Sequence, residues 1–291
     1  MRMVLYYSKS SPSSTFLRET RHLIGREDWL RSVLALLDET LPKKLVVLQG
    51  PVGIGKSSEL HRLASHLLSV EASRTRIILC DLPVAEHDVE PESMLDVFLA
   101  TILAEAGPLG SVMPMVSLNV RITFALEALK QTSHPILLLL DNAEHLLDTR
   151  GRLAPCWEQF LAQFLRSQHH AMLFMATKEW HGWPGRDGQF IAEITVPLLR
   201  LQDGVSLLQR LGLERVPVEY LQAISERVAG IPLCLEWVAR LAHDPWELDE
   251  WWDLSSQPER GEQGNPNTIT QRIIRLLEEP ALPLRRGDST P

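Results

Sequence analysis

Several features that mark special classes of protein are missing from this sequence. Only three of its 291 residues are cysteines (Cys80, Cys156 and Cys234), and their wide spacing excludes a paired-cysteine metal or redox motif. The longest purely apolar run, residues 171–176, is too short to span a bilayer. The net charge of −8 argues against a general nucleic-acid coat, which needs a surplus of lysine and arginine. These absences predict a soluble, cytoplasmic protein with reduced cysteines.

What remains is an ordinary globular composition. Hydrophobic residues make up 45% of the chain and charged residues 23%, which suffices for a packed core. At roughly 150 residues per domain, the length predicts about two domains. We expect a flexible N-terminal arm over residues 1–20, a first domain over 21–200, a second over 201–252, and a linker with a polar tail over 253–291.

Two apolar periodicities alternate along the first domain. Short aliphatic runs predict buried strands, and apolar residues spaced by three and four predict helices. We expect strands at 45–48, 76–80, 136–140, 172–176 and 194–197. We expect helices at 93–106, 118–131 and 157–167, besides one that carries residues 30–37 and is capped by Asp28, and one that carries residues 60–68. This alternation predicts a three-layer α/β domain, in which helices cover both faces of a parallel sheet.

The second domain has a different pattern, because no strand is expected after about residue 201. Helical periodicity at 204–211, 218–228 and 232–242 predicts a small all-α domain. One more short helix carries residues 269–277.

A glycine-rich segment directly follows the strand expected at 45–48. Residues 50–57 match the pattern GxxxxGK[ST], whose glycines let backbone N–H groups converge on phosphate oxygens. In such a loop, Lys56 neutralises charge between the β and γ phosphates, and the Ser57 hydroxyl binds Mg²⁺. The position between a strand and an amphipathic helix predicts a P-loop NTPase. The candidate phosphate-binding residues are Gly50, Gly53, Ile54, Gly55, Lys56, Ser57 and Ser58.

Further candidates follow the next two aliphatic strands. Asp141 ends an apolar run, where a carboxylate can hold the Mg²⁺ shell. Glu144 could orient or activate the attacking water, or it could be a solvated loop acid. Asn142 could hydrogen-bond the water instead. Thr177 or Lys178, after a strand expected beside that of Asp141, could reach a γ phosphate, and a plain exposed lysine is the alternative.

Four motifs in this order resemble the STAND NTPases, the NB-ARC-type signalling switches. They are Ile24-Gly25-Arg26-Glu27, the segment GPVGIGKSS, the segment LLLLDNAEHLLD at residues 137–148, and Gly230-Ile231-Pro232-Leu233. The sequence of the third motif is most similar to that of bacterial regulator ATPases. The resemblance extends over about residues 20–245, and the ordered set is more specific than any single motif.

The resemblance implies a function and a role for each matching position. Ile24 and Arg26 would line the adenine side of the pocket, residues 53–58 would hold the phosphates, and Asp141 would hold the metal. Pro232 would close over the base from the helical domain. The implied ligands are ATP or ADP with Mg²⁺, and the implied function is a signalling switch, for which we expect slow or no ATP hydrolysis. A protein partner or a second copy of the chain would bind to it.

The sequence departs from the family pattern in two places. Where bacterial relatives carry Thr-Arg or Ser-Arg, this chain has Thr177-Lys178, and lysine keeps the charge but lacks the bidentate fork of arginine. Family members also continue into a winged-helix domain and a repeat-built sensor. Only residues 268–279 resemble the start of that next domain, so we expect a truncated or degenerate member.

Two other functions fit the same motifs. One is an AAA-type ATPase with robust turnover, which needs an arginine finger from Arg200, Arg210 or Arg240. The other is a non-enzymatic adaptor, in which ADP holds the two domains together.

Overall fold

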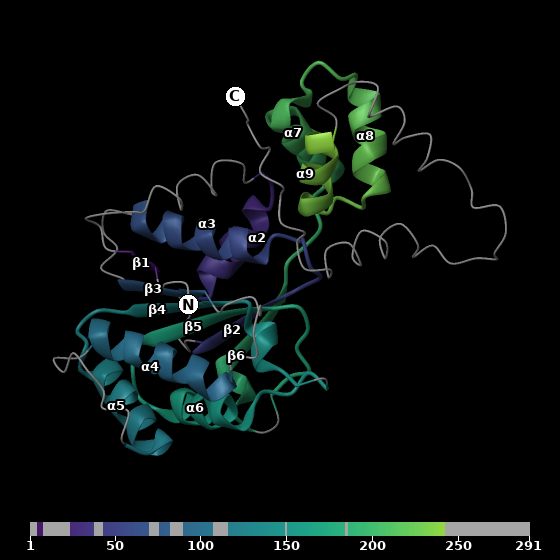
Figure 1. The fold of residues 1–291 in the computed structure, drawn as a ribbon. Helices are drawn as coiled ribbons and strands as arrows, with labels where there is room; N and C mark the ends of the chain where they lie inside the picture. Colours follow the sequence, from purple (N-terminus) through teal and green to yellow (C-terminus); the bar gives the residue numbers. More distant parts are fainter. Residues whose placement is uncertain are drawn as a thin grey trace, which may run out of the picture. The chain divides into compact units, whose positions relative to one another are not determined.

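The computed structural model describes residues 5–7, 24–37, 43–69, 76–81, 90–106, 116–148, 150–183 and 186–241. These residues belong to two compact units, one ending at Pro197 and the other beginning at Leu198 (Figure 1). The expected helix at 269–277 and the expected tail at 253–291 lie outside the described residues.

Among the described residues of the first unit, six strands form one central sheet. Its strands in chain order are β1 (Leu5–Tyr7), β2 (Leu45–Gln49), β3 (Arg76–Asp81), β4 (Ile136–Asp141), β5 (Ala171–Thr177) and β6 (Ile191–Thr195). In space the order is β1-β3-β4-β5-β2-β6, and every pair from β3 to β6 is parallel. The carboxyl ends of β2, β4 and β5 therefore meet at one edge of the sheet, with β5 between the other two.

Helices cover both faces of this sheet (Figure 1). One face carries α2 (Glu27–Ala35) and α3 (Lys56–Ser69), and the other carries α4 (Pro91–Ala106), α5 (Leu118–Gln131) and α6 (Pro155–Arg166). Side chains of β4 alternate between the two cores: Leu137 and Leu139 pack with α2 and α3, whereas Leu138 and Leu140 pack with the other three helices. The predicted three-layer α/β class is confirmed.

The strand β1 lies within the expected N-terminal arm over residues 1–20 and adds an antiparallel edge to the parallel sheet. Its residues pair antiparallel with β3, so that Tyr6 lies opposite Ile78. Leucine and tyrosine fit a pleated surface well, and an edge strand has backbone groups that need partners. The rest of the expected arm lies outside the described residues.

Two boundaries differ from the sequence prediction. Asp28 does not cap its helix, because α2 begins at Glu27 and Arg26 holds the cap position in a left-handed conformation with φ of 62°. Asp28 lies instead in the first turn, where a negative charge favours the helix dipole. The strand expected at 194–197 is β6 at Ile191–Thr195, because Pro197 has no N–H for the ladder.

The part of the second unit that the structure describes, residues 198–241, contains helices and no strand, as predicted. It contains α7 (Leu201–Leu208), a π-helical turn η4 (Gln209–Leu213), α8 (Val218–Arg227) and α9 (Pro232–Leu241). Gly230, just before α9, has φ of 65°, and a Cβ there would lie 2.4 Å from the carbonyl oxygen of Leu199. Only glycine fits this close approach. Within the described ranges, no helix of either unit combines the length and the apolar character needed to cross a membrane.

A polar cluster joins the end of α6 to β5 in the first unit. The Lys44 ammonium donates to the carbonyl oxygens of Leu165 (2.7 Å) and Ser167 (2.6 Å) at the helix end. The backbone N–H of Ala171 donates to His169 Nδ1 (3.2 Å), and His169 Nε2 lies 3.1 Å from the Phe164 carbonyl oxygen. With Nδ1 an acceptor and Nε2 a donor, the imidazole fits as the neutral form.

The buried imidazole predicts a loss of stability in acid. Burial, assisted by the charge of Lys44, lowers the pKa of His169 from 6.5 to about 4. Because the unfolded chain binds this proton more readily, stability contributed by neutral His169 is complete above pH 6.5 and falls as the pH drops toward 4. We expect a loss of up to about 3 kcal/mol over this window, measured by urea unfolding. His169→Gln should flatten the dependence, and an unchanged slope in that variant would contradict the assignment. His170→Gln, at the exposed neighbour, is the matched control.

Candidate functional site

The glycine-rich segment forms a loop between β2 and α3. Gly53 and Gly55 have φ of 79° and 93°, conformations that other residues rarely adopt. Ile54 between them is buried in the core on the α2 and α3 side, which anchors the loop. The Lys56 ammonium folds back over the loop and donates to the carbonyl oxygens of Gly50 (2.8 Å) and Pro51 (3.2 Å).

Asp141 and Ser57 meet at the carboxyl end of β4. The Asp141 side chain is buried, and its carboxylate forms a hydrogen bond with the Ser57 side chain and accepts one from the backbone N–H of Asn142 (2.9 Å). Burial raises the pKa of Asp141, whereas these two hydrogen bonds lower it. A serine hydroxyl and a carboxylate therefore lie side by side next to the loop.

Glu144 follows on the short 3₁₀ helix η2 (Ala143–Leu146), which Asn142 begins in a left-handed conformation with φ of 56°. Its Oε2 atom is buried and has no hydrogen-bond partner in the described chain. Burial lowers the pKa of Lys56, and the charges of Glu144 and then Asp141 raise it. The carboxylate of Glu144 thus lies within electrostatic reach of the loop lysine.

Sheet order brings the end of β5 to the same place. Thr177 pairs with Gln49, the last residue before the loop, and is fully buried. Its hydroxyl donates to the carbonyl oxygen of Glu179 (3.1 Å), inside its own turn. The charge of Lys178 lowers the pKa of Lys56, so the two ammonium groups are neighbours. Which of Thr177 and Lys178 faces a γ phosphate stays a prediction.

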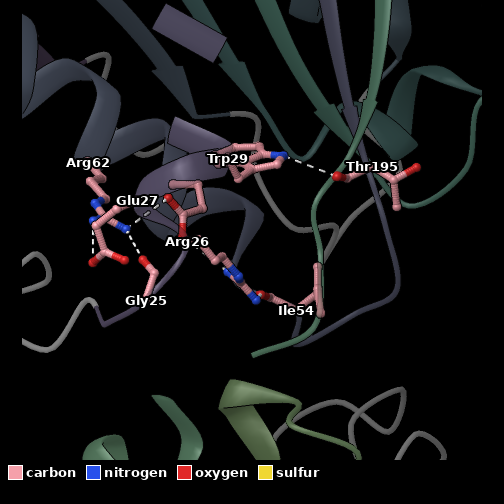
Figure 2. A network of polar contacts seen from close by, with 8 residues as sticks. Gly25, Arg26, Glu27, Trp29, Ile54, Arg62 and Thr195 are labelled. Carbon is pink, nitrogen blue, oxygen red and sulfur yellow. Dashed lines mark hydrogen bonds and ion pairs between the residues drawn. The ribbon is translucent and has the colours of Figure 1, made fainter. Parts of the chain in front are cut away.

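Arg26 contacts the loop at Ile54 and belongs to a polar network (Figure 2). Its side chain is 4% exposed, donates to the Ile54 carbonyl oxygen (2.8 Å) and pairs with Glu59 of α3 (3.1 Å). Ile24 lies two residues earlier and is partly buried. Pro232 begins α9 in the second unit. The adenine-side roles of Ile24, Arg26 and Pro232 stay predictions.

Sequence reasoning missed three residues near the loop, all on α3. Glu59 is 2% exposed and is paired with Arg26, and Arg62 lies 3.8 Å from its second oxygen. His61, one turn after Ser57, lowers the pKa of Asp141 through its charge. One signal was available, because Glu59 lies four residues before Leu63 and so on the apolar face of the helix. His61 carries no comparable signal.

Comparison with known proteins gives structural matches only. No family model matches the sequence, and no curated protein does. The chain is similar in structure to the Walker-type ATPase of Pyrococcus abyssi, with a TM-score of 0.53 and 16% identity over 88% of this chain and 76% of that one. It is also similar to the ORC1 protein of Aeropyrum pernix, solved in complex with DNA, with a TM-score of 0.52 and 18% identity over 87% and 66%.

A third similar structure is the STAND protein with a tetratricopeptide repeat sensor from Pyrococcus horikoshii. Its TM-score is 0.48 and its identity 16%, over 84% of this chain and 34% of that one. The chain thus spans about a third of the length of that protein. Taken with the sheet order and the loop between β2 and α3, the two likenesses above a TM-score of 0.5 establish that this chain has the fold of P-loop NTPases.

Proposed function

We propose that this chain binds ATP or ADP with Mg²⁺ and hydrolyses ATP slowly, as the nucleotide switch of a STAND, NB-ARC-type protein. The observation that carries the proposal is the convergence of Lys56, Ser57, Asp141 and Glu144 at the carboxyl edge of the parallel sheet. This edge is where open α/β sheets bind their ligands. The four motifs that resemble the family support the finer assignment.

The residues at this edge fit both a polyphosphate and a divalent cation. Mg²⁺ prefers hard oxygen ligands, and the Ser57 hydroxyl and the Asp141 carboxylate supply one each. When bound, the ion would neutralise the negative charge that builds up on the phosphates. The Oε2 of Glu144, which has no hydrogen-bond partner among the described residues, is an acceptor that can bind a hydrogen-bond donor at this edge of the sheet.

Each protein group has a distinct role in this proposal. Lys56 exchanges its bonds to the loop carbonyls for bonds to phosphate oxygens, in which the acceptor is charged as well as the donor. Glu144 accepts the proton of the attacking water, and Asn142 is the alternative residue for holding that water. Lys178 faces the terminal phosphate.

The small number of contacts to that phosphate explains why the switch between the ATP and ADP states should be weak. Driving a switch from 1:99 to 99:1 takes about 5.5 kcal/mol of differential affinity, and one charge-assisted hydrogen bond contributes about 1.5–3 kcal/mol. About two to four contacts specific to the γ phosphate are therefore needed. The chain offers Lys178 and Glu144, the lower end of that range.

The test is to denature the purified chain and to identify any released nucleotide by chromatography, with Lys56→Ala alongside. We expect stoichiometric ADP from the wild type and little from the variant, because losing the charged donor lowers affinity by about 10- to 100-fold. Lys130→Ala, which removes an exposed lysine on α5, is the control and should retain ADP. A wild-type chain that carries no nucleotide and binds no added ATP would contradict the proposal.

Turnover separates the rival functions. Robust hydrolysis that is lost on substituting Arg200, Arg210 or Arg240 would indicate an AAA-type ATPase. Retained ADP with no hydrolysis, and a stability unchanged by Glu144→Gln but lost with Lys56→Ala, would indicate an adaptor.

A protein partner or a second copy of the chain is part of the switch proposal, and size-exclusion chromatography with ATP and with ADP tests self-association.

A further inference from the structure

We propose that Arg26 is a positioning residue for the phosphate-binding loop: it holds the Ile54–Gly55 peptide so that the Gly55 N–H faces the phosphates. The inference rests on the proposed function, because it concerns how the same loop recognises a polyphosphate. It differs from the role that the family resemblance implies, in which Arg26 lines the adenine side of the pocket.

The guanidinium of Arg26 joins two parts of the loop region. Its Nη2 donates to the Ile54 carbonyl oxygen (2.8 Å), and its Nη1 donates to the Glu59 carboxylate (3.1 Å). Both side chains of the ion pair are nearly inaccessible, at 4% and 1% exposed. Figure 2 shows the Arg26 side chain pointing toward Ile54. A planar fork can satisfy both acceptors at once, which a single ammonium group on lysine cannot do with the same geometry.

The geometry of the peptide bond means that the contact of Arg26 with the Ile54 carbonyl also sets the direction of the Gly55 N–H. A trans peptide is planar, and its C=O and N–H bonds point in opposite directions. Holding the Ile54 oxygen against Arg26 therefore aims the Gly55 N–H at the opposite side of the loop. In a P-loop the backbone N–H groups cradle the phosphates, so the loop carbonyls must point away and need donors of their own. Arg26 is such a donor.

The backbone before α2 is held in the conformation that delivers this side chain. Gly25 and Arg26 have φ of 73° and 62°, and a left-handed conformation is unfavourable for arginine, so it persists only where the surroundings enforce it. Arg62 of α3 supplies part of that enforcement, because it donates to the Gly25 carbonyl oxygen (2.5 Å) and pairs with Glu27 (3.3 Å). Arg26 reaches from this turn to Glu59 on α3, and Arg62 reaches from α3 back to Gly25 in the turn, so the two arginines hold the turn against α3.

This arrangement predicts that Arg26 contributes to the affinity for the phosphates and not to the recognition of the base. The decisive variant is the double substitution Arg26→Met with Glu59→Met, which replaces the buried ion pair with apolar side chains and so avoids leaving a buried carboxylate unpaired. The Ile54 carbonyl still loses its donor. Arg62 keeps its contacts with Gly25 and Glu27. Arg31→Met, which removes an exposed arginine of α2, is the matched control.

The experiment measures dissociation constants for Mg-pyrophosphate, ADP and GDP by calorimetry on the full chain after removal of bound nucleotide. We expect the double variant to bind pyrophosphate and ADP about tenfold more weakly than the wild type, and by the same factor. Its preference for ADP over GDP should be unchanged. The control variant should bind all three ligands as the wild type does, and circular dichroism should show the native helix content in both variants.

The other results are also informative. A loss confined to ADP, or a changed ratio of ADP to GDP affinity, would overturn the inference in favour of a contact with the base. Wild-type affinity in a folded double variant would overturn it in favour of a purely structural ion pair. If the double variant does not fold, Glu59→Gln with Arg26 intact should keep pyrophosphate affinity within about twofold, and a tenfold loss there would overturn the inference. A wild-type chain that binds no pyrophosphate and no ADP overturns the proposed function itself.

Discussion

Replacing Glu144 by glutamine is expected to slow ATP hydrolysis by about 100- to 10,000-fold, the usual contribution of a general base. Glutamine keeps the shape of the side chain but cannot accept a proton from water. The effect on ADP affinity should be small, because the proposed phosphate ligands are Lys56 and the loop N–H groups. Phosphate release under single-turnover conditions measures the first quantity, and calorimetry with ADP measures the second.

Asn142 provides the control for this prediction. Its backbone is left-handed with φ of 56°, so Asn142→Gly removes the side chain without straining the turn. We expect this variant to hydrolyse ATP within a few-fold of the wild type. If Asn142→Gly loses turnover and Glu144→Gln keeps it, the two assigned roles are reversed. If both keep it, neither residue handles the attacking water.

The single substitution Arg26→Met is expected to destabilise the first unit by about 3–5 kcal/mol, the usual consequence of breaking a buried ion pair from one side. It leaves the Glu59 carboxylate 1% exposed, with Arg62 at 3.8 Å as its remaining cation. The double substitution with Glu59→Met should recover most of this loss. Urea unfolding followed by tryptophan fluorescence measures both variants.

The loss in Arg26→Met should depend on pH. Burial raises the pKa of Glu59, and the charge of Arg26 lowers it, so removing the arginine raises this pKa further. A protonated carboxyl is easier to bury than a carboxylate, and the folded variant therefore gains stability relative to the wild type as the pH falls through the raised pKa. We expect a smaller difference between variant and wild type at pH 5 than at pH 8. A difference that does not change with pH would show that Glu59 is not the group responsible.

Much of the first unit could be predicted from local patterns. The strand β4 is five aliphatic residues followed by Asp141, a run that has few alternatives to a buried parallel strand. The strand β6 was misplaced because only Ile191 of its five residues is buried, so that no buried apolar run marks the strand. The strand β1 has three residues and depends on pairing with β3, about 70 residues further along the chain, which local propensity does not reveal.

The candidate site likewise has residues that the sequence spacing predicts and residues that only the fold brings together. The loop lysine, the serine and the strand-end aspartate follow from spacing, because the fold needs those residue types at those positions. The pairing of Arg26 with Glu59 joins residues 33 positions apart. Neither residue is unusual in the sequence, and only the approach of α2 to α3 makes them partners. The family resemblance drew attention to Arg26 but assigned it to the adenine side.

The place of β5 in the sheet has a consequence for how such a protein can diversify. One strand separates the loop-bearing β2 from the carboxylate-bearing β4, and neighbouring strands lie about 4.8 Å apart. The residue after that intervening strand, Lys178, is therefore brought to the middle of the site by backbone pairing, whatever its side chain. In the proposed switch, selection can exchange that one residue and alter the response to the nucleotide, while the loop and the Ser57–Asp141 pair keep their sequence. That proposal therefore assigns affinity and responsiveness to separate segments of the chain.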